Sequence, residues 1–260
     1  MDIHSLRCFS SRPGTGNPAL VIEDHAQDPD ARQALARARG TTCVFLDADA
    51  GGALSVDFYY PHMRSPLCLH ATLAVAAVLF GRRPDAGTIA VRTALKGQML
   101  ELVRSENDYF VRLAAQPVAA TDVDAASAAQ LLGVPAGSLA TPPRVASVGS
   151  PKLLVKVADT DALYSLSPDL ARIAAWGKDA GINGIYAWCR RDDGTFEGRN
   201  FNHLDPQLED SATGVAAGAL TALLGLGIRL RQGRATGGDC LIRTRVEGAT
   251  ILVGGAAETF

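Results

Sequence analysis

Residues 209–218 read Glu-Asp-Ser-Ala-Thr-Gly-Val-Ala-Ala-Gly, and the fold follows from the change of character within this stretch. A short polar segment ends at Ser211, and an almost wholly apolar run extends from Thr213 to Leu224. A helix with little polar surface has to be buried, so this run predicts a central helix enclosed by other elements. The polar residues stand just before the helix, where its first N–H groups lack backbone partners.

The first half of the chain contains a similar arrangement. Residues 67–72 read Leu-Cys-Leu-His-Ala-Thr, and the apolar run continues to Phe80. A glycine–proline segment precedes each run, Gly-Asn-Pro at 16–18 and Gly-Ser-Pro at 149–151. Two matched features in the same order and at similar spacing predict a duplicated domain, with strands wrapped around a central helix in each half.

Two further helices are predicted from their capping residues. Asp28 before Pro29 is typical of an N-cap followed by a proline at the first helical position, and this helix should end at Gly40. Ser167 before Pro168 predicts a second such start, with an end near Gly177. Other expected elements are a helix from near Asp122 to Gly133 and strands that include 43–47, 54–60, 184–190, 240–246 and 250–253.

Composition excludes several classes of protein. The 260 residues carry a formal net charge of −2, which does not suit a nucleic-acid partner. Five cysteines at wide spacing, without a Cys-x-x-Cys pair, do not indicate a disulfide framework or a zinc site. The first residues lack the pattern of a secretion signal, and no apolar run is long enough to span a bilayer. We therefore expect a cytoplasmic protein without a membrane partner.

Residues able to exchange protons are placed at the starts of the two apolar helices. They are Cys68, His70, Asp210, Ser211 and Thr213. Helix N-termini favour anions, so two such ends facing each other across a cleft between the halves would bind a small carboxylate substrate. Each residue also has a structural interpretation, Cys68 and His70 through packing or backbone contacts and the others as helix caps.

At this point the sequence resembles the phenazine-biosynthesis PhzF-like family of the diaminopimelate-epimerase fold. Residues 9–21, with Gly-Asn-Pro-Ala at 16–19, resemble the family's opening segment. Residues 67–74 resemble its Cys-Gly-His-Ala-Thr segment. Residues 199–201 and 209–218 resemble its Arg-x-Phe and Glu-Asp-Pro-Ala-Thr-Gly-Ser-Ala-Ala-Gly segments, and the similarity covers nearly the whole chain in order.

The resemblance implies an α+β fold of two pseudo-symmetric lobes. Each would be a strongly curved, mostly antiparallel sheet around a central apolar helix. We expect the lobes at 1–117 and 118–249, with the last strand, about 250–260, as a candidate completion of the first lobe. The family implies a homodimer that acts without a cofactor or metal. Its characterised members are isomerases that shift a proton on small amino or imino acids in specialised, antibiotic-type biosynthesis.

The resemblance also implies which residues form the site. The catalytic candidates are His70, Asp210 and Cys68. The substrate-binding candidates are Asn17, Thr42, Leu69, Ala71, Ser211, Ala212, Thr213, Gly214 and Arg64. His62 and His203 are further candidate contacts for a substrate carboxylate.

Several positions depart from the family pattern. Thr42 stands where the family has its catalytic glutamate, and threonine is not a general base at neutral pH. Leu69 replaces a glycine, Arg64 an acid, Ser211 a proline and Val215 a serine. Two alternatives can supply the missing base. Cys68, activated at a helix N-terminus, would act as in the racemase relatives. Otherwise His70 and Asp210 would form the proton relay.

Three functions stay open on the sequence. An isomerase would incorporate solvent protons into its product. A non-catalytic binding protein would keep the fold without the base. A lyase such as a dehydratase would release water through the same acid and base. A Rossmann dehydrogenase is disfavoured, because Gly-Thr-Gly at 14–16 lacks the third glycine and the following helix.

Overall fold

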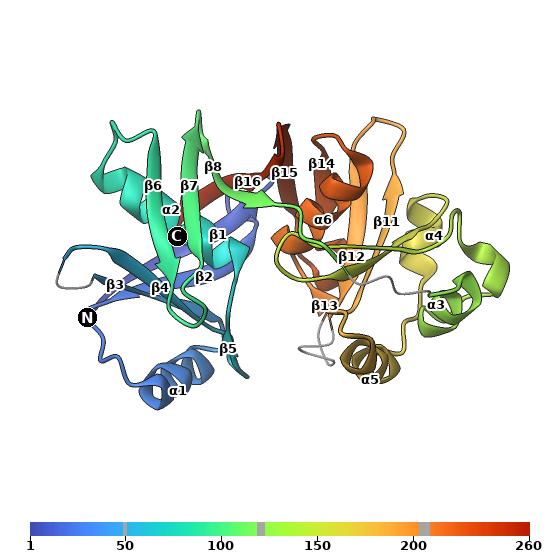
Figure 1. Ribbon diagram of the computed structural model, residues 1–260, viewed down its shortest axis with the longest axis horizontal. Coiled ribbons are helices and arrows are strands. Elements are labelled where there is room, and N and C mark those ends of the chain that lie inside the picture. Colours follow the sequence, from blue (N-terminus) through green and yellow to red (C-terminus); the bar gives the residue numbers. More distant parts are fainter. Residues whose placement is uncertain (49–50, 119–122, 203–208) are drawn as a thin grey trace. The chain divides into compact units, whose positions relative to one another are not determined.

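The computed structural model describes residues 1–48, 51–118, 123–202 and 209–260. The chain divides into two compact units, residues 1–113 with 252–260 and residues 114–251. Each unit combines a sheet with a buried central helix, as expected for the α+β fold (Figure 1). Among the described residues no helix has the length and apolarity that a bilayer crossing requires.

The first unit is a sheet wrapped around helix α2 (Leu69–Arg82). Its strands follow the order β1-β2-β3-β4-β6-β7-β8-β16, and β16 also pairs with β1, which closes the sheet on itself. The strands are β1 (Asp2–Ser10), β2 (Asn17–Glu23), β3 (Thr42–Ala48), β4 (Leu54–Tyr59), β6 (Thr88–Thr93), β7 (Met99–Ser105), β8 (Asp108–Ala114) and β16 (Thr250–Thr259), with the short β5 (Arg64–Ser65) paired to β4.

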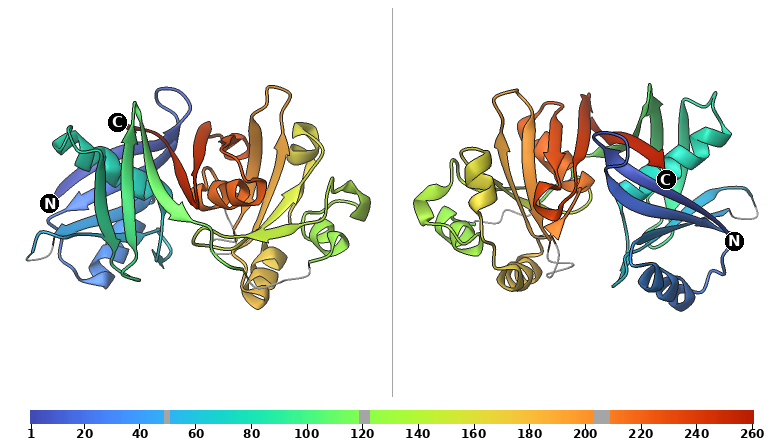
Figure 2. Two further views of the ribbon diagram at one scale, coloured as in Figure 1. Left: turned by 45° about the horizontal axis from the view of Figure 1, so that its top comes forward. Right: turned by 180° about the vertical axis from the view of Figure 1, so that it is seen from behind.

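Helix α2 fills the space inside this sheet because nearly every side chain of its first two turns is apolar. Residues 69–76 are all buried, and the helix contacts β1, β2, β3, β6 and β7. Helix α1 (Pro29–Arg39) packs on the other face of the sheet, against β3 and β4, where Ala36 belongs to a cluster with Phe45 and Tyr59. The two helices therefore lie on opposite faces of the sheet (Figure 2).

The second unit repeats this plan around helix α6 (Gly214–Leu224). Its sheet has the order β15-β14-β12-β11-β10-β9, with β13 paired to β12. The strands are β9 (Arg144–Ala146), β10 (Lys152–Lys156), β11 (Ile185–Arg190), β12 (Phe196–Phe201), β13 (Glu209–Asp210), β14 (Arg229–Gln232) and β15 (Cys240–Glu247). The other helices are α3 (Ala125–Leu131), α4 (Thr160–Ser165) and α5 (Leu170–Ala180), with short 3-10 turns at Ala136–Ser138 and Arg234–Thr236.

Strand pairing shows the internal repeat directly. β2 runs parallel to β3, and β10 runs parallel to β11. β4 pairs with the short β5 and parallel with β6, while β12 pairs with the short β13 and parallel with β14. The buried helix follows the short strand in each unit, α2 after β5 and α6 after β13. The two polar segments singled out in the sequence thus occupy equivalent places.

The glycine–proline segments begin equivalent strands, β2 and β10. Gly16 has φ of +105°, and a Cβ atom there would lie 2.7 Å from the carbonyl oxygen of Cys8. Only glycine fits such close backbone approach. Gly149 has φ of +146° at the matching place before β10.

Capping predictions were right for one helix and wrong for another. The Asp28 side chain accepts from the N–H groups of residues 30 and 31, and α1 ends at Gly40 as predicted. Ser167 is not an N-cap: α5 begins at Leu170, because Asp169 accepts from the N–H of Arg172. The helix also continues past Gly177 to Ala180, with Gly181 in the left-handed conformation.

The remaining helical expectations also needed adjustment. Asp122 lies outside the described residues, and α3 starts at Ala125 with Asp124 as its N-cap. Helix α4 was not predicted. It is only six residues long, and the Asp159 side chain caps it by accepting from the N–H of Ala162.

Candidate active site

The first group of candidate residues surrounds the N-terminus of α2. Cys68 is the N-cap residue, and its Sγ atom lies 3.3 Å from Nδ1 of His70. Both side chains are buried, with exposed fractions of 2% and 7%. The backbone carbonyl of Cys68 accepts hydrogen bonds from the N–H and the hydroxyl of Thr72. The thiol and the imidazole are thus held together at the start of a rigid helix.

The environment favours the thiolate of Cys68. Burial alone raises the pKa of this thiol, but the charge of His70 and hydrogen bonds from His70, Tyr60 and the Ala71 N–H outweigh it, so the pKa is lowered. Three other buried thiols differ in this respect. Burial raises the pKa of Cys43 and Cys189 to about 11 and that of Cys240 to about 12. Cys68 is therefore the thiol suited to act as a base or nucleophile.

A network of ion pairs fixes the segment that leads to Cys68. Arg64 donates to both carboxylate oxygens of Asp57, at 2.8 and 3.1 Å. Arg32, from α1, donates to the same carboxylate at 3.2 Å and binds Asp47 through two nitrogens. Arg64 was expected to contact a substrate carboxylate. In the structure its guanidinium binds the carboxylate of Asp57, and its contact with a substrate stays a prediction.

The other candidates of the first unit lie on β2, β3 and α2, or near Tyr60. Asn17 begins β2, and Thr42 begins β3, beside Ala19 in the strand register. Thr42 has 8% of its surface exposed, and Leu69 and Ala71 are buried in the first turn of α2. The ring of His62 stacks on Tyr60. His203 lies outside the described residues.

The second group surrounds the N-terminus of α6. The hydroxyl of Thr213 donates to Oδ2 of Asp210 at 2.6 Å, and the N–H of Ala212 donates to Oδ1 at 3.4 Å. The carboxylate of Asp210 therefore holds the turn before α6 through these two hydrogen bonds. Gly214 is the first residue of the helix. Ser211 is linked through its hydroxyl to Thr236 at 2.7 Å.

Gln232 of β14 holds this turn from the side. Its Nε2 donates to the carbonyl of Asp210 at 2.7 Å and to the hydroxyl of Thr213 at 3.0 Å. Its Oε1 accepts from the N–H of Thr213 at 3.2 Å and from the hydroxyl of Tyr186 at 3.0 Å. Gln232 is 3% exposed, and its bonds with Thr213 and Tyr186 are buried, whereas its bond to the carbonyl of Asp210 is half-buried. Gln232 and Gly233 fit the family resemblance, but the sequence did not assign this role.

Lys152 is a buried cation near the second group. It begins β10, it is 1% exposed, and its Nζ donates to the backbone carbonyl of Asn183. Burial lowers its pKa to about 8, and the charge of Asp210 acts in the opposite direction. The sequence did not identify Lys152, and its position in the Gly-Ser-Pro-Lys segment was the only signal available.

The second unit contains a half-buried ion pair next to this turn. Arg199 of β12 donates to both oxygens of Glu209, with a shortest distance of 2.8 Å, and to the carbonyls of Leu163 and Leu166. These residues belong to the Arg-x-Phe and Glu-Asp segments of the sequence. The pair anchors β13, and hence Asp210, to helix α4.

Chemically, the two groups offer a thiol–imidazole pair and a carboxylate–hydroxyl pair, each at the N-terminus of a buried helix. Both can transfer protons, and helix N-termini favour anions. Within the described parts of the chain, no three histidine, cysteine or acidic side chains are grouped in a way that could hold a metal ion. The two groups belong to different units.

The sequence matches the family described as phenazine biosynthesis-like protein over residues 6–259. The chain belongs to this family. An uncharacterized isomerase of Deinococcus radiodurans is 29% identical over 89% of this chain and 79% of its own length. The family and the names of such relatives indicate an isomerase of the PhzF type.

Solved structures of the family share the fold. A predicted epimerase from Pseudomonas aeruginosa, PA4716, superposes with a TM-score of 0.80 at 27% identity and covers 99% of this chain and 96% of its own. A PhzF-family protein of Bacillus anthracis gives 0.82 at 19% identity, covering 100% and 97% of the two chains. These similarities confirm the PhzF-like recognition and the expected α+β fold.

Proposed function

We propose that this protein is a cofactor-independent isomerase that moves a proton on a small amino or imino acid in specialised, antibiotic-type biosynthesis. The observation that carries the proposal is the distance of 3.3 Å between Cys68 Sγ and His70 Nδ1, in a setting that lowers the pKa of the thiol. The family's glutamate position holds Thr42, so another base is required, and a thiolate paired with an imidazolium supplies one.

The reaction then needs only proton transfers. The Cys68 thiolate removes a proton from a carbon made acidic by a neighbouring carboxylate or imine, and becomes a thiol. The His70 imidazolium donates its proton to a second carbon of the resulting conjugated anion, and becomes neutral. The new thiol passes its proton to His70, which restores the starting pair. The substrate gains and loses one proton, as an isomerisation requires.

Asp210 is the second catalytic candidate in this proposal. Its carboxylate fixes the turn before α6 through Thr213 and Ala212, whose backbone would help to bind a substrate carboxylate. Ser211 and Gly214 belong to the same turn. A homodimeric assembly, taken from the resemblance to the family, and a cytoplasmic location, taken from the sequence pattern, are part of the same proposal.

Deuterium exchange tests this function without knowledge of the natural substrate. The protein is incubated in heavy water with a panel of small unsaturated amino and imino acids, and carbon-bound deuterium is measured by mass spectrometry. We expect exchange that falls at least about 100-fold in Cys68→Ser and His70→Asn, the usual contribution of an acid–base residue. Asp179→Asn, an exposed acid on α5, is the control and should keep full exchange.

Two results would replace the proposal with an alternative. Binding of a panel compound without exchange in the wild-type protein would indicate a non-catalytic member of the fold. Loss of water from the compound would indicate a lyase. Equal exchange in wild type, Cys68→Ser and His70→Asn would show that the thiol–imidazole pair does not perform the chemistry.

A further inference from the structure

Asn200 of β12 carries a fully buried amide without hydrogen-bond partners. The residue is 0% exposed, and neither its Nδ2 nor its Oδ1 has a partner among the described residues. A buried amide that makes no hydrogen bond costs free energy, because the bonds that it made with water are not replaced. Such a group needs an explanation, and the surroundings of Asn200 favour a ligand that supplies both missing bonds.

Asn200 lies on the face of the sheet that carries the turn before α6. In the strand register it pairs with Tyr186 of β11 and with Asp210 of β13, and directly opposite side chains share a face. Its two sequence neighbours face the other way. Arg199 donates to backbone carbonyls in and just after α4, and Phe201 belongs to the core cluster on that side. The unpaired amide is therefore beside the carboxylate of Asp210.

Lys152 of β10 is on the same face. Leu154 pairs with Tyr186, and Lys152, two residues before Leu154, points to the same side of the sheet. Its Nζ donates to the carbonyl of Asn183, and in the described part of the chain this ammonium makes no ion pair. The charge of Asp210 acts on it, so the two groups are near each other. A buried ammonium with one neutral acceptor keeps further N–H groups for an anion.

The site reaches the surface at the end of β12. Asp210 and Ser211, which lie beside Asn200, are half-buried, and so is Asn202, two residues further along the chain. A small molecule that enters past these residues meets the amide and the N-terminus of α6, whose partial positive charge favours an anion.

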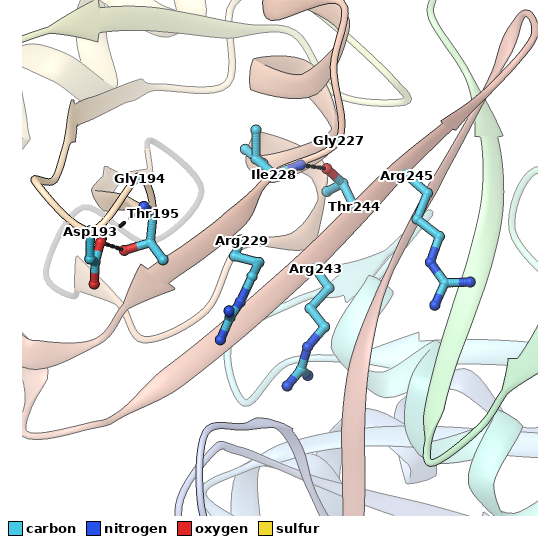
Figure 3. A pocket seen from close by; sticks show the side chains of 9 residues that line it. All are labelled: Asp193, Gly194, Thr195, Gly227, Ile228, Arg229, Arg243, Thr244 and Arg245. Carbon is cyan, nitrogen blue, oxygen red and sulfur yellow. Dashed lines mark hydrogen bonds between the residues drawn. The ribbon is translucent and has the colours of Figure 1, made fainter.

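A cavity of about 580 Å³ elsewhere in the second unit does not include these groups. It is lined by residues 193–195, 227–229 and 243–245 (Figure 3). Hydrogen bonds within this lining join Ile228 to Thr244 and Thr195 to Asp193 (Figure 3). The unpaired amide of Asn200 therefore marks a different place.

We propose that Asn200 and Lys152 bind the carboxylate and the nitrogen of an amino-acid or imino-acid substrate beside Asp210. The Lys152 ammonium and the Asn200 Nδ2 donate to the carboxylate, and the Asn200 Oδ1 accepts from the N–H of the amino or imino group. A carboxylate without a neighbouring N–H would satisfy only half of the amide. This inference rests on the proposed function and adds to it two residues that select the substrate class.

Anthranilate is a suitable probe, because it has a carboxylate and an amino group on neighbouring carbons and its aromatic ring has no proton to shift. Calorimetry on the full chain at pH 7 compares it with benzoate, which lacks the amino group. Wild type should bind anthranilate at least about tenfold more tightly than benzoate. Lys152→Met should lose at least about tenfold in affinity for both compounds, and Asn200→Leu should lose most of the preference for anthranilate.

The matched control is Asn107→Leu, at an exposed turn of the first unit, which should bind both compounds as wild type does. Urea unfolding then separates binding from a structural role. Because the amide of Asn200 has no partner in the ligand-free chain, Asn200→Leu should be as stable as wild type or more stable. The proposal is overturned by absence of anthranilate binding to wild type, by an unchanged affinity in Lys152→Met, by an unchanged preference in Asn200→Leu, or by a less stable Asn200→Leu.

Deuterium exchange distinguishes failure of this inference from failure of the proposed function. If wild type exchanges a panel compound, Asn200→Leu and Lys152→Met should raise its KM. An unchanged KM in both variants would remove their binding role and leave the isomerase in place. Loss of anthranilate binding in the variants, without any exchange in wild type, would keep the binding site and remove the isomerase.

Discussion

Gln232 and Thr213 are joined by two hydrogen bonds that run in opposite directions. The N–H of Thr213 donates to Oε1 of Gln232, and Nε2 of Gln232 donates to the Thr213 hydroxyl. A side-chain amide on a strand thus takes the place of a cap for helix α6. In the same way Cys68 begins α2 without a side-chain cap bond. Neither buried helix is therefore capped by the side chain of its own N-cap residue.

Replacing Gln232 by methionine should destabilise the protein by about 2–4 kcal/mol, because it leaves the buried N–H of Thr213 and hydroxyl of Tyr186 without a partner. Urea unfolding measures the change. Gln130→Met, at an exposed position of α3, is the matched control and should stay within about 0.5 kcal/mol of wild type. A Gln232→Met variant as stable as this control would show that the amide is dispensable.

Cys68 should react with iodoacetamide at lower pH than an ordinary thiol, whose pKa is about 8.5. Peptide mass spectrometry between pH 5 and 9 would follow each cysteine, with Cys43, Cys189 and Cys240 as internal controls that stay unreactive because burial raises their pKa. His70→Asn should move the pH profile of Cys68 upward, since it removes the charge that lowers the thiol pKa. An unchanged pH profile of Cys68 in this variant would show that His70 does not lower the pKa of the thiol.

Lys152 should make the protein more stable as the pH rises from about 8 to 10.5. Its pKa in the folded state is lowered to about 8 by burial, whereas in the unfolded chain it returns to its ordinary value of 10.5. In this window the unfolded state binds more protons, so raising the pH favours folding; below the window both states are protonated.

The difference in unfolding free energy between wild type and Lys152→Met isolates this effect from other titrating groups. The unfolding free energy of wild type should rise relative to that of the variant by at most roughly 3 kcal/mol between pH 8 and 10.5. Lys178→Met, at an exposed position of α5, is the control, and its unfolding free energy should change with pH as that of wild type does. A constant difference between wild type and Lys152→Met would mean that Lys152 keeps an ordinary pKa.

Arg32→Met should destabilise the first unit by about 3–5 kcal/mol, because it leaves the buried carboxylate of Asp57 short of one cation and removes the partner of Asp47. Guanidinium unfolding would measure the change. Arg112→Met is the comparison. It breaks a pair with Glu101 in which the side chains are 29% and 45% exposed, and it should cost at most about 1 kcal/mol. A similar loss of unfolding free energy in the two variants would show that burial of the ion pairs around Asp57 does not increase their contribution to stability.

Much of the fold was predictable because its deciding signals are local. The two apolar runs became the buried helices Leu69–Arg82 and Gly214–Leu224, since a helix without a polar face has to lie inside a sheet. The N-cap at Asp28 was also predictable from adjacent residues, Asp28 and Pro29. The start of α5 was not, because Ser167 and Asp169 are both good caps and only the observed chain path selects Asp169.

The site was predictable only in part, for the same reason. Cys68 and His70 were both named as candidates, but the sequence paired His70 with Asp210 and did not predict the contact between the thiol and the imidazole. Positions two apart do not face each other within a helix, and here the extended backbone of the N-cap Cys68 allows the contact. The role of Gln232 depends on β14 lying beside β12 and the turn at Asp210, 22 residues earlier in the chain. The ion pair of Arg64 with Asp57 was not predicted, because Asp57 is on the neighbouring strand rather than in the same motif.

The closure of the first sheet by β16 has a consequence for synthesis on the ribosome. Strand β16 lies between β8 and β1, yet residues 252–260 are translated only after the whole of residues 114–251. Until they emerge, the first unit carries two open strand edges, which are sites of unwanted pairing with other chains. We therefore expect a nascent chain that has not reached residue 252 to depend on chaperones, even though residues 1–113 contain nearly all of that unit's core.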